Sequence, residues 1–332
     1  MSLTKLDIDR FITTLRTKSK EFNSISNVQL ASMLEETISN IKEVAFFWAT
    51  ICSDNKGTTK TPAEGEEWLG GPFASVLATQ YYIKSLTNDD DLVEKKYNSE
   101  ENSYKVFPNS FTERITFPFI DAKVIFNKSM SFEDINKYRG FSKRYDIDPS
   151  ITLVLGAGNF SSIPYLDVLY HLITRKSVIL LKLNPVNEYL KPVFEKVFQS
   201  FIERGYIIVT TGNIDESKYM ANHPGINHIH LTGSDKTFED IVYGRELTEK
   251  ERKSKSLSKI NNKPITSELG NVTPIIIHPG KWSTSDIKYQ ARKIVTAKLN
   301  NNGFNCIAAQ VVVLPDGWGQ TETLIKFVKH YM

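Results

Sequence analysis

Cysteine is scarce in this chain, which has only Cys52 and Cys306 among its 332 residues. Two thiols so far apart provide neither a disulfide framework nor the paired spacing of a structural zinc site. The six histidines show no ligand spacing either, so we expect no metal site. Free thiols are typical of a reducing compartment, and we therefore expect the protein in the cytoplasm.

Neither sign of charge dominates, because 41 basic residues accompany 38 acidic ones and the formal net charge is +3. Such a balance argues against nucleic acid or an anionic membrane as the main partner. No apolar run approaches the length of a membrane-spanning helix, and charged residues interrupt positions 1–20, which argues against a signal peptide. The length and a hydrophobic content of 40% predict a globular protein with more than one domain.

Helical periodicity characterises the first part of the chain. Over 28–48 the apolar residues recur mostly three or four apart, which gives a helix one buried face. We therefore expect 1–110 to be mainly helical. Over 111–126 the chain is rich in β-branched and aromatic residues and is interrupted by Pro118, which predicts edge strands. We interpret 111–149 as a strand-rich arm or bridging segment.

Strands and helices alternate from residue 151 onward. The expected strands lie at 151–155, 177–183, 206–210 and 226–231. Repeated units of this length form a parallel sheet covered by helices on both faces. We predict an α/β fold in which 150–269 is a doubly wound domain.

The residues that follow these strands are small, amide-bearing or cationic. They include Gly156, Gly158, Asn159, Lys182, Gly212, Gly233 and Ser234. Doubly wound sheets bind ligands at the carboxyl ends of their strands, where small residues let backbone N–H groups approach a phosphate. The usual Gly-x-Gly-x-x-Gly fingerprint is broken at Ser161, and Lys182 replaces the acidic ribose ligand. The pattern favours a variant dinucleotide site, and a plain tight turn with a surface lysine is the structural alternative.

Cys306 lies on a turn rich in glycine and asparagine, between a helical pattern and a strand expected at 310–314. Loops on a rigid scaffold often carry chemistry, so this thiol is a candidate nucleophile. On its position alone, a buried and inert thiol is the alternative interpretation.

The order of these motifs resembles the aldehyde dehydrogenase superfamily from about residue 151 to 314. The segment 155–164 resembles the turn that carries the oxyanion asparagine, and 179–182 resembles the strand that ends in the ribose-binding lysine. The segment 230–234 resembles the turn beside the pyrophosphate. The segment 266–270 resembles the motif with the general base, and 301–306 resembles the nucleophile loop. The segment 66–72 resembles the acyl-CoA reductase branch of the same superfamily.

The resemblance implies NAD or NADP as cofactor and an aldehyde or an acyl-thioester as substrate. It assigns Cys306 as nucleophile, Glu268 as general base and Asn159 as oxyanion donor. The implied cofactor-binding residues are Gly158, Lys182, Gly212, Thr232, Gly233, Ser234, Leu269 and Gly270. In this chemistry a thiohemiacetal on the cysteine becomes a thioester, which is hydrolysed or exchanged with coenzyme A.

Several residues depart from the family pattern. Asn271 replaces the second glycine after Glu268, and Phe304 replaces the glutamine before the nucleophile. Pro185 stands where members that prefer NAD often carry a glutamate. The choices between NAD and NADP, and between hydrolysis and coenzyme A, therefore stay open. We interpret the charged insertion 245–263 as a solvated surface.

The resemblance implies that 150–269 is the dinucleotide-binding α/β domain and that 270–332 is the start of a catalytic α/β domain. It also implies a longer chain, because the family continues through that second domain. An amphipathic helix expected from residue 321 onward would need a partner for Leu324, Ile325 and Val328, and a short sheet would expose an apolar face. We expect a truncated chain that pairs with a complementing C-terminal fragment or forms a homo-oligomer. A non-catalytic cofactor-binding fragment is the third functional hypothesis, beside the aldehyde dehydrogenase and the acyl-thioester reductase.

Overall fold

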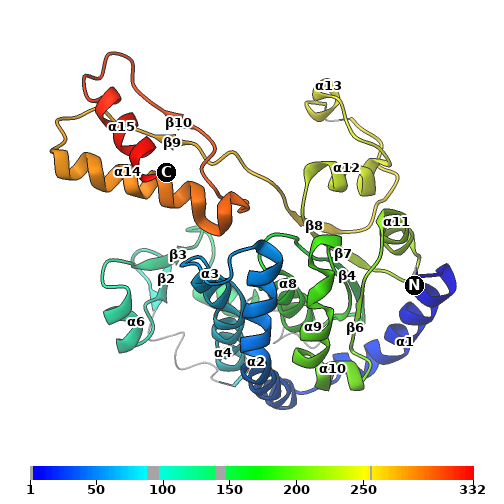
Figure 1. The fold of residues 1–332 in the computed structure, drawn as a ribbon. Coiled ribbons are helices and arrows are strands. Elements are labelled where there is room, and N and C mark those ends of the chain that lie inside the picture. Colours follow the sequence, from blue (N-terminus) through cyan, green and yellow to red (C-terminus); the bar gives the residue numbers. More distant parts are fainter. Residues whose placement is uncertain (1–2, 88–96, 139–146, 255) are drawn as a thin grey trace.

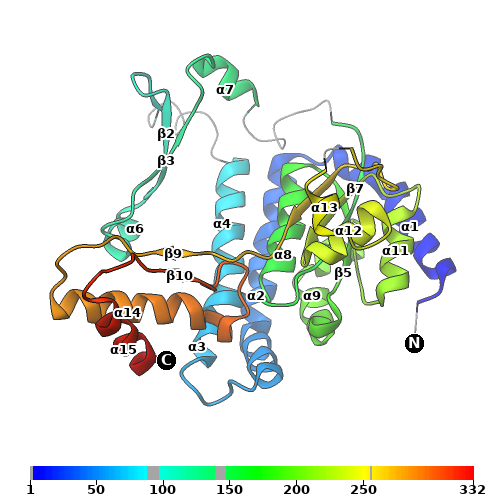
Figure 2. The same cartoon turned by 90° about the horizontal axis from the view of Figure 1, so that it is seen from above.

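The computed structural model describes residues 3–87, 97–138, 147–254 and 256–332. Its main body is a parallel sheet enclosed by helices, with a strand-containing arm on one side and a C-terminal unit beside it (Figures 1 and 2). Within the described ranges, no helix is both long and apolar enough to cross a membrane. The same residues contain no group of three or more His, Cys, Asp or Glu suited to a metal ion.

Two long N-terminal helices begin where the sequence supplies capping residues. Helix α1 (Lys5–Asn23) follows Thr4 and α2 (Asn27–Lys56) follows Ser26, each through a reciprocal capping box that satisfies backbone N–H groups. Helix α2 ends at Gly57, whose φ of 67° is the left-handed conformation that glycine adopts without strain. The chain continues through α3 (Glu64–Trp68), the π-helical turn η1 (Leu69–Phe73) and α4 (Ala74–Thr87).

The central sheet has five parallel strands in the order β6-β5-β4-β7-β8. These strands are β4 (Ile151–Leu155), β5 (Val178–Lys182), β6 (Ile207–Thr210), β7 (His228–Thr232) and β8 (Ile265–Glu268). The sequence predicts the first four correctly, because β4, β5 and β6 are nearly continuous apolar runs and β7 alternates histidine with apolar residues. It misses β8, an edge strand in which Ile265 is the only apolar residue and which is mostly exposed.

Helices cover both faces of this sheet, so the predicted doubly wound α/β fold is confirmed. One face carries α8 (Ile163–Leu169), α9 (Lys191–Val197) and α10 (Gln199–Glu203), with α2 and α4 packed outside them. The other face carries α1 and α11 (Ile214–Asn222). The remaining connections contain η3 (Tyr170–Thr174), η4 (Pro185–Leu190), α12 (Asp235–Tyr243) and α13 (Glu249–Arg252).

The arm begins earlier than expected and includes a helix. An antiparallel sheet in the order β1-β2-β3 starts within the part predicted to be helical. Its elements are β1 (Tyr97–Asn98), β2 (Ser103–Phe107), α6 (Phe111–Thr116), β3 (Ala122–Ile125) and α7 (Phe132–Tyr138). The expectation of strands over 111–116 is wrong because Ser110 and Glu113 form a capping box that starts a helix there. Residues 139–146 of the predicted arm lie outside the described ranges.

The C-terminal unit combines two short strands with two helices. Its elements are β9 (Ile275–Ile276), α14 (Thr284–Leu299), η5 (Asn300–Gly303), β10 (Val312–Val313) and α15 (Thr321–Tyr331). Strands β9 and β10 pair in parallel, and β10 lies within the strand expected at 310–314. Ile276 is 74% exposed. The expected amphipathic helix is α15. Its Leu324 is buried against residues of α14 such as Ile287, whereas Ile325 is 37% exposed.

Phe198 offers a test of the packing between the sheet and its helices. Its ring is fully buried and stacks on Tyr165, with 5.1 Å between the ring centroids. We expect Phe198→Ala to lower the free energy of unfolding by about 3–5 kcal/mol, because it removes a buried ring and leaves a cavity. Phe119→Ala is the matched control, since Phe119 is 98% exposed and should change the value by less than about 0.5 kcal/mol. Urea denaturation followed by circular dichroism measures both, and equal effects would contradict the packing described.

Candidate functional site

The order of the strands creates a crevice between the carboxyl ends of β4 and β7, which is where doubly wound sheets bind ligands. A cavity of about 880 Å³ opens there. Its lining includes all three predicted catalytic residues, Asn159, Glu268 and Cys306. Six predicted cofactor residues also line it, namely Gly158, Thr232, Gly233, Ser234, Leu269 and Gly270. Side chains from three distant parts of the sequence therefore face one space.

A second cavity of about 540 Å³ lies over the ends of β4 and β5 and shares Thr232, Gly233 and Ser234 with the first. Lys182 lines it and is only 6% exposed. Burial holds the pKa of the Lys182 ammonium below its usual value, and Glu188 and Glu216 partly oppose this shift. The two cavities together connect a buried cation with the cysteine loop.

Gly212 is the one predicted cofactor residue that lines neither cavity. It follows β6, and a Cβ atom at this position would lie 2.8 Å from Glu216 Oε2. Glu216 caps the start of α11 by accepting a hydrogen bond from the Asn213 backbone. The geometry therefore explains this glycine through packing of the turn, and its cofactor role stays a prediction.

Gly158 allows the turns after β4 and β5 to approach each other closely. A Cβ atom at Gly158 would lie 2.8 Å from the Asn184 side chain. Asn184 itself is the N-cap of η4, where its Oδ1 accepts a hydrogen bond from the Val186 N–H. A larger residue at 158 would displace either the turn with Asn159 or this cap, so the glycine is needed beside the cavity.

The cysteine loop has an uncommon backbone. Asn301, Asn302 and Gly303 have φ values of 52°, 55° and 81°, so three successive residues are left-handed. Asparagine and glycine tolerate this conformation better than other residues, which explains the Asn-Asn-Gly sequence. Strained backbone of this kind persists only where the surroundings hold it in place.

The two thiols occupy contrasting environments. Cys306 is half-buried at the cavity, and its Sγ lies 3.7 Å from Asn305 Oδ1, which also accepts a hydrogen bond from the Ile307 N–H. Cys52 is fully buried in α2, and burial raises the pKa of its thiol to about 11. Only Cys306 is therefore placed for reaction with a molecule from solution.

Sequence reasoning missed several residues around the site. Lys56 lines the larger cavity and donates hydrogen bonds to Glu67 and Asn301. The Thr232 hydroxyl, which lines the same cavity, donates to Asp167, which also lies 3.2 Å from His230 Nε2. Nothing in the local sequence signals these contacts, because they join segments far apart in the chain.

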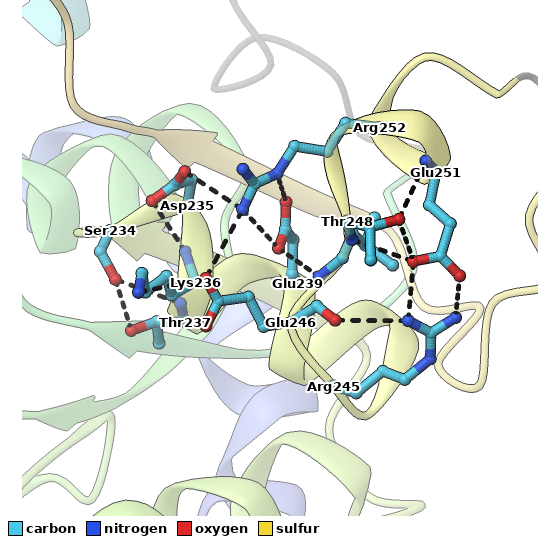
Figure 3. A network of polar contacts seen from close by, with 11 residues as sticks. Ser234, Asp235, Lys236, Thr237, Glu239, Arg245, Glu246, Thr248, Glu251 and Arg252 are labelled. Atoms are coloured by element: carbon cyan, nitrogen blue, oxygen red, sulfur yellow. Dashed lines mark hydrogen bonds and ion pairs between the residues drawn. The ribbon is translucent and has the colours of Figure 1, made fainter.

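The charged insertion is cross-linked by ion pairs (Figure 3). Arg245 pairs with Glu251 at 2.5 Å, and Arg252 pairs with Glu239 of α12 at 2.6 Å. The Glu239 side chain is only 7% exposed, so this second pair ties the insertion to α12. The described part of the insertion is largely exposed, as expected, but it forms the short helix α13.

Comparison with known proteins gives one family match. The aldehyde dehydrogenase family matches residues 173–331 of this chain. A D-glyceraldehyde dehydrogenase (NADP(+)) from Picrophilus torridus is 25% identical over 169 residues, which are 50% of this chain and 31% of that protein.

Solved structures share the fold over nearly the whole chain. Lactaldehyde dehydrogenase from Escherichia coli gives a TM-score of 0.65 at 14% identity, covering 100% of this chain and 57% of that one. The NADP complex of an NADP-dependent glyceraldehyde-3-phosphate dehydrogenase from Bacillus halodurans C-125 gives 0.62 at 16% identity, covering 99% and 57%. The chain thus spans little more than half the length of these structures.

The contrast between the two thiols can be tested by alkylation. We expect iodoacetamide at pH 7.5 to label Cys306 and to leave Cys52 unmodified in the folded protein. Burial excludes the reagent from Cys52, and a pKa of about 11 keeps it protonated until the pH rises toward that value. Peptide mass spectrometry locates the label, and labelling in urea controls for Cys52 recovery. Equal labelling of both in the folded state would contradict the site.

Proposed function

We propose that the protein oxidises an aldehyde with NAD or NADP through a thiohemiacetal and then a thioester on Cys306. The observation that carries this proposal is the shared cavity of Cys306, Asn159 and Glu268. A half-buried thiol, an amide and a carboxylate are the groups that acyl transfer through cysteine requires. The family match over residues 173–331 supports the same class of reaction.

The two cavities suit a dinucleotide. Lys182 supplies a cation for ribose hydroxyls or phosphate, and Ser234 caps the N-terminus of α12 beside the shared wall. Gly158, Thr232, Gly233, Leu269 and Gly270 would contact the rest of the cofactor, and Gly212 would border it. The cofactor, when bound, supplies a nicotinamide ring that accepts hydride. Pro185 in place of a glutamate and the NADP-dependent relatives favour NADP.

The chain's own residues account for the remaining steps. The Cys306 thiol gives its proton to water and Sγ bonds to the carbonyl carbon, which moves negative charge to the oxygen. The Asn159 amide and the Cys306 backbone N–H would donate hydrogen bonds to that oxygen. After oxidation of the carbon, Glu268 would take a proton from water, whose oxygen attacks the thioester so that the C–S bond breaks. The carboxylic acid leaves, and Glu268 would return the proton to the thiolate.

A second candidate function is reduction or exchange of an acyl-thioester with coenzyme A. It is favoured by Glu268, whose carboxylate is exposed and has no hydrogen bond or ion pair with any residue in the described ranges. Nothing in that part of the chain therefore orients Glu268 toward a water molecule. Transfer of the acyl group to a thiol does not require such a base.

Variants at the thiol and the carboxylate test the reaction and its branch. We expect Cys306→Ala to abolish the acyl adduct that intact-mass spectrometry detects after incubation with hexanal or D-glyceraldehyde and NADP. If water hydrolyses the thioester, Glu268→Gln should increase the amount of acyl adduct on Cys306 above that in the wild type, since the base that activates the water is lost. Under the coenzyme A branch Glu268→Gln should leave release by coenzyme A unchanged. Binding of NADP without any adduct in the wild type would instead favour the non-catalytic fragment.

Lys182 tests the cofactor site. We expect Lys182→Met to weaken NADP binding by about tenfold or more, since a buried charged hydrogen-bond donor is removed while the apolar stem is kept. Lys191→Met is the control, because Lys191 lines neither cavity and its half-buried side chain pairs with Glu195 one turn further along α9. Isothermal calorimetry measures both affinities. An unchanged affinity in Lys182→Met would contradict the assignment of this cavity.

A further inference from the structure

Four side chains form a cluster that joins the N-terminal helices to the cysteine loop. Lys56 is the last residue of α2, Glu66 and Glu67 lie on α3, and Asn301 belongs to η5. Glu67 and Asn301 are only 4% and 5% exposed. We call these four residues the loop clamp. Its contacts connect positions more than two hundred residues apart, so only the folded chain brings them together.

The ammonium group of Lys56 makes three hydrogen bonds within the loop clamp. Its Nζ donates to Glu67 Oε1 at 2.8 Å, to Glu67 Oε2 at 3.0 Å and to Asn301 Oδ1 at 2.8 Å. A lysine ammonium has three N–H donors and no acceptor. Although Lys56 lines the larger cavity, these partners occupy its donors, and the geometry fits a residue that positions others.

The lysine fixes which way the Asn301 amide points. Because Lys56 can only donate, the amide oxygen of Asn301 must face it and the amide nitrogen must face the other side. That nitrogen donates to the Phe304 carbonyl at 2.8 Å and to the Asn159 carbonyl at 3.2 Å. One amide group therefore cross-links the turn before the thiol and the turn that carries the candidate oxyanion donor.

The backbone of the loop is held at the same point. The Asn301 N–H donates to Glu66 Oε2 at 2.6 Å, and the Phe304 N–H donates to the Asn301 carbonyl at 2.9 Å. These bonds hold a residue whose φ of 52° lies in the left-handed region. Hydrogen bonds to charged groups are stronger than neutral ones, so the carboxylate and the ammonium can offset the strain of this backbone.

We propose that Lys56, Glu66 and Glu67 are positioning residues that set the distance between the Cys306 thiol and the Asn159 amide by orienting Asn301. This inference rests on the proposed function for its catalytic meaning. None of the three carboxyl or ammonium groups takes part in bond making. Their effect reaches the reacting atoms through a single buried amide and the two carbonyl groups that it binds.

Asn301→Asp is the sharpest test of the loop clamp. Aspartate has the same shape, tolerates a left-handed backbone and still accepts a hydrogen bond from Lys56, but it cannot donate to the two carbonyls. We expect hydrogen exchange of the amides over 300–308 to accelerate by about tenfold or more, because loop opening becomes easier. Exchange in β4 should be unchanged. Mass spectrometry of the full chain measures both segments.

Lys56→Met tests the orienting role separately. It removes the donor and keeps the apolar stem, and it should accelerate exchange over 300–308 in the same direction. Lys42→Met is its matched control, since Lys42 is an exposed lysine on the same helix. In that variant the amides over 300–308 should exchange as fast as in the wild type. Protection of Cys52 from iodoacetamide shows that each variant is folded. Lys56→Arg should restore part of the protection, because a guanidinium also donates to both partners.

The outcomes separate this inference from the proposed function. Wild-type exchange over 300–308 in both Asn301→Asp and Lys56→Met would overturn the loop clamp. Accelerated exchange with an unchanged kcat would overturn its positioning role, because the expected result is a lower kcat with little change in the KM for the aldehyde. An active Cys306→Ala variant would defeat the proposed function instead, whatever the exchange measurements show.

Discussion

The parallel pairing of β4 with β7 is the constraint on which the rest of the site depends. Leu155 of β4 lies opposite Leu231 of β7, so both strands end at the same level. The turns that follow, with Asn159 after one strand and Gly233 after the other, must therefore open into the same crevice. Strand β8 extends this edge through the pair of Thr232 with Glu268. Hydrophobic burial of the strands thus determines where polar side chains meet.

A second constraint connects the N-terminal helices to the same crevice. Gly70 and Gly71 lie on η1, with two residues between them and the glutamates of the loop clamp. A Cβ atom at Gly70 would lie 2.8 Å from the Phe160 ring, and one at Gly71 would lie 2.9 Å from Ser161 Oγ. The segment that resembles the acyl-CoA reductase branch therefore packs against the turn with Asn159, while its carboxylates hold the cysteine loop. These contacts explain the glycines and glutamates of this segment without any binding of coenzyme A.

The sequence predicts the helices and strands that are determined by neighbouring residues, and it misses those that depend on contacts between distant segments. Strands β4, β5 and β6 are continuous apolar runs, whereas β8 pairs with β7 although Ile265 is its only apolar residue. The helix at 111–116 depends on one cap that outweighs the β propensity of its residues. The resemblance of the motif order to the aldehyde dehydrogenase superfamily predicts Cys306, Glu268 and Asn159 as site residues, and their roles stay predictions. The contact of Lys56 with Asn301 cannot be predicted from either local segment, because lysine and asparagine are both common surface residues.

The two sides of the candidate site differ in how firmly they are held. On the side of the thiol, the Asn301 side chain and backbone bind two carbonyls, one ammonium and one carboxylate. On the other side, Glu268 ends an exposed edge strand, and in the described part of the chain its carboxylate contacts no partner. Attack on a carbonyl carbon demands a fixed distance between nucleophile and oxyanion donor, whereas removal of the acyl group can use any acceptor that reaches the thioester. Under the proposed function, the holding contacts are therefore concentrated where the first bond forms, and either water or a second thiol that enters the cavity can accept the acyl group.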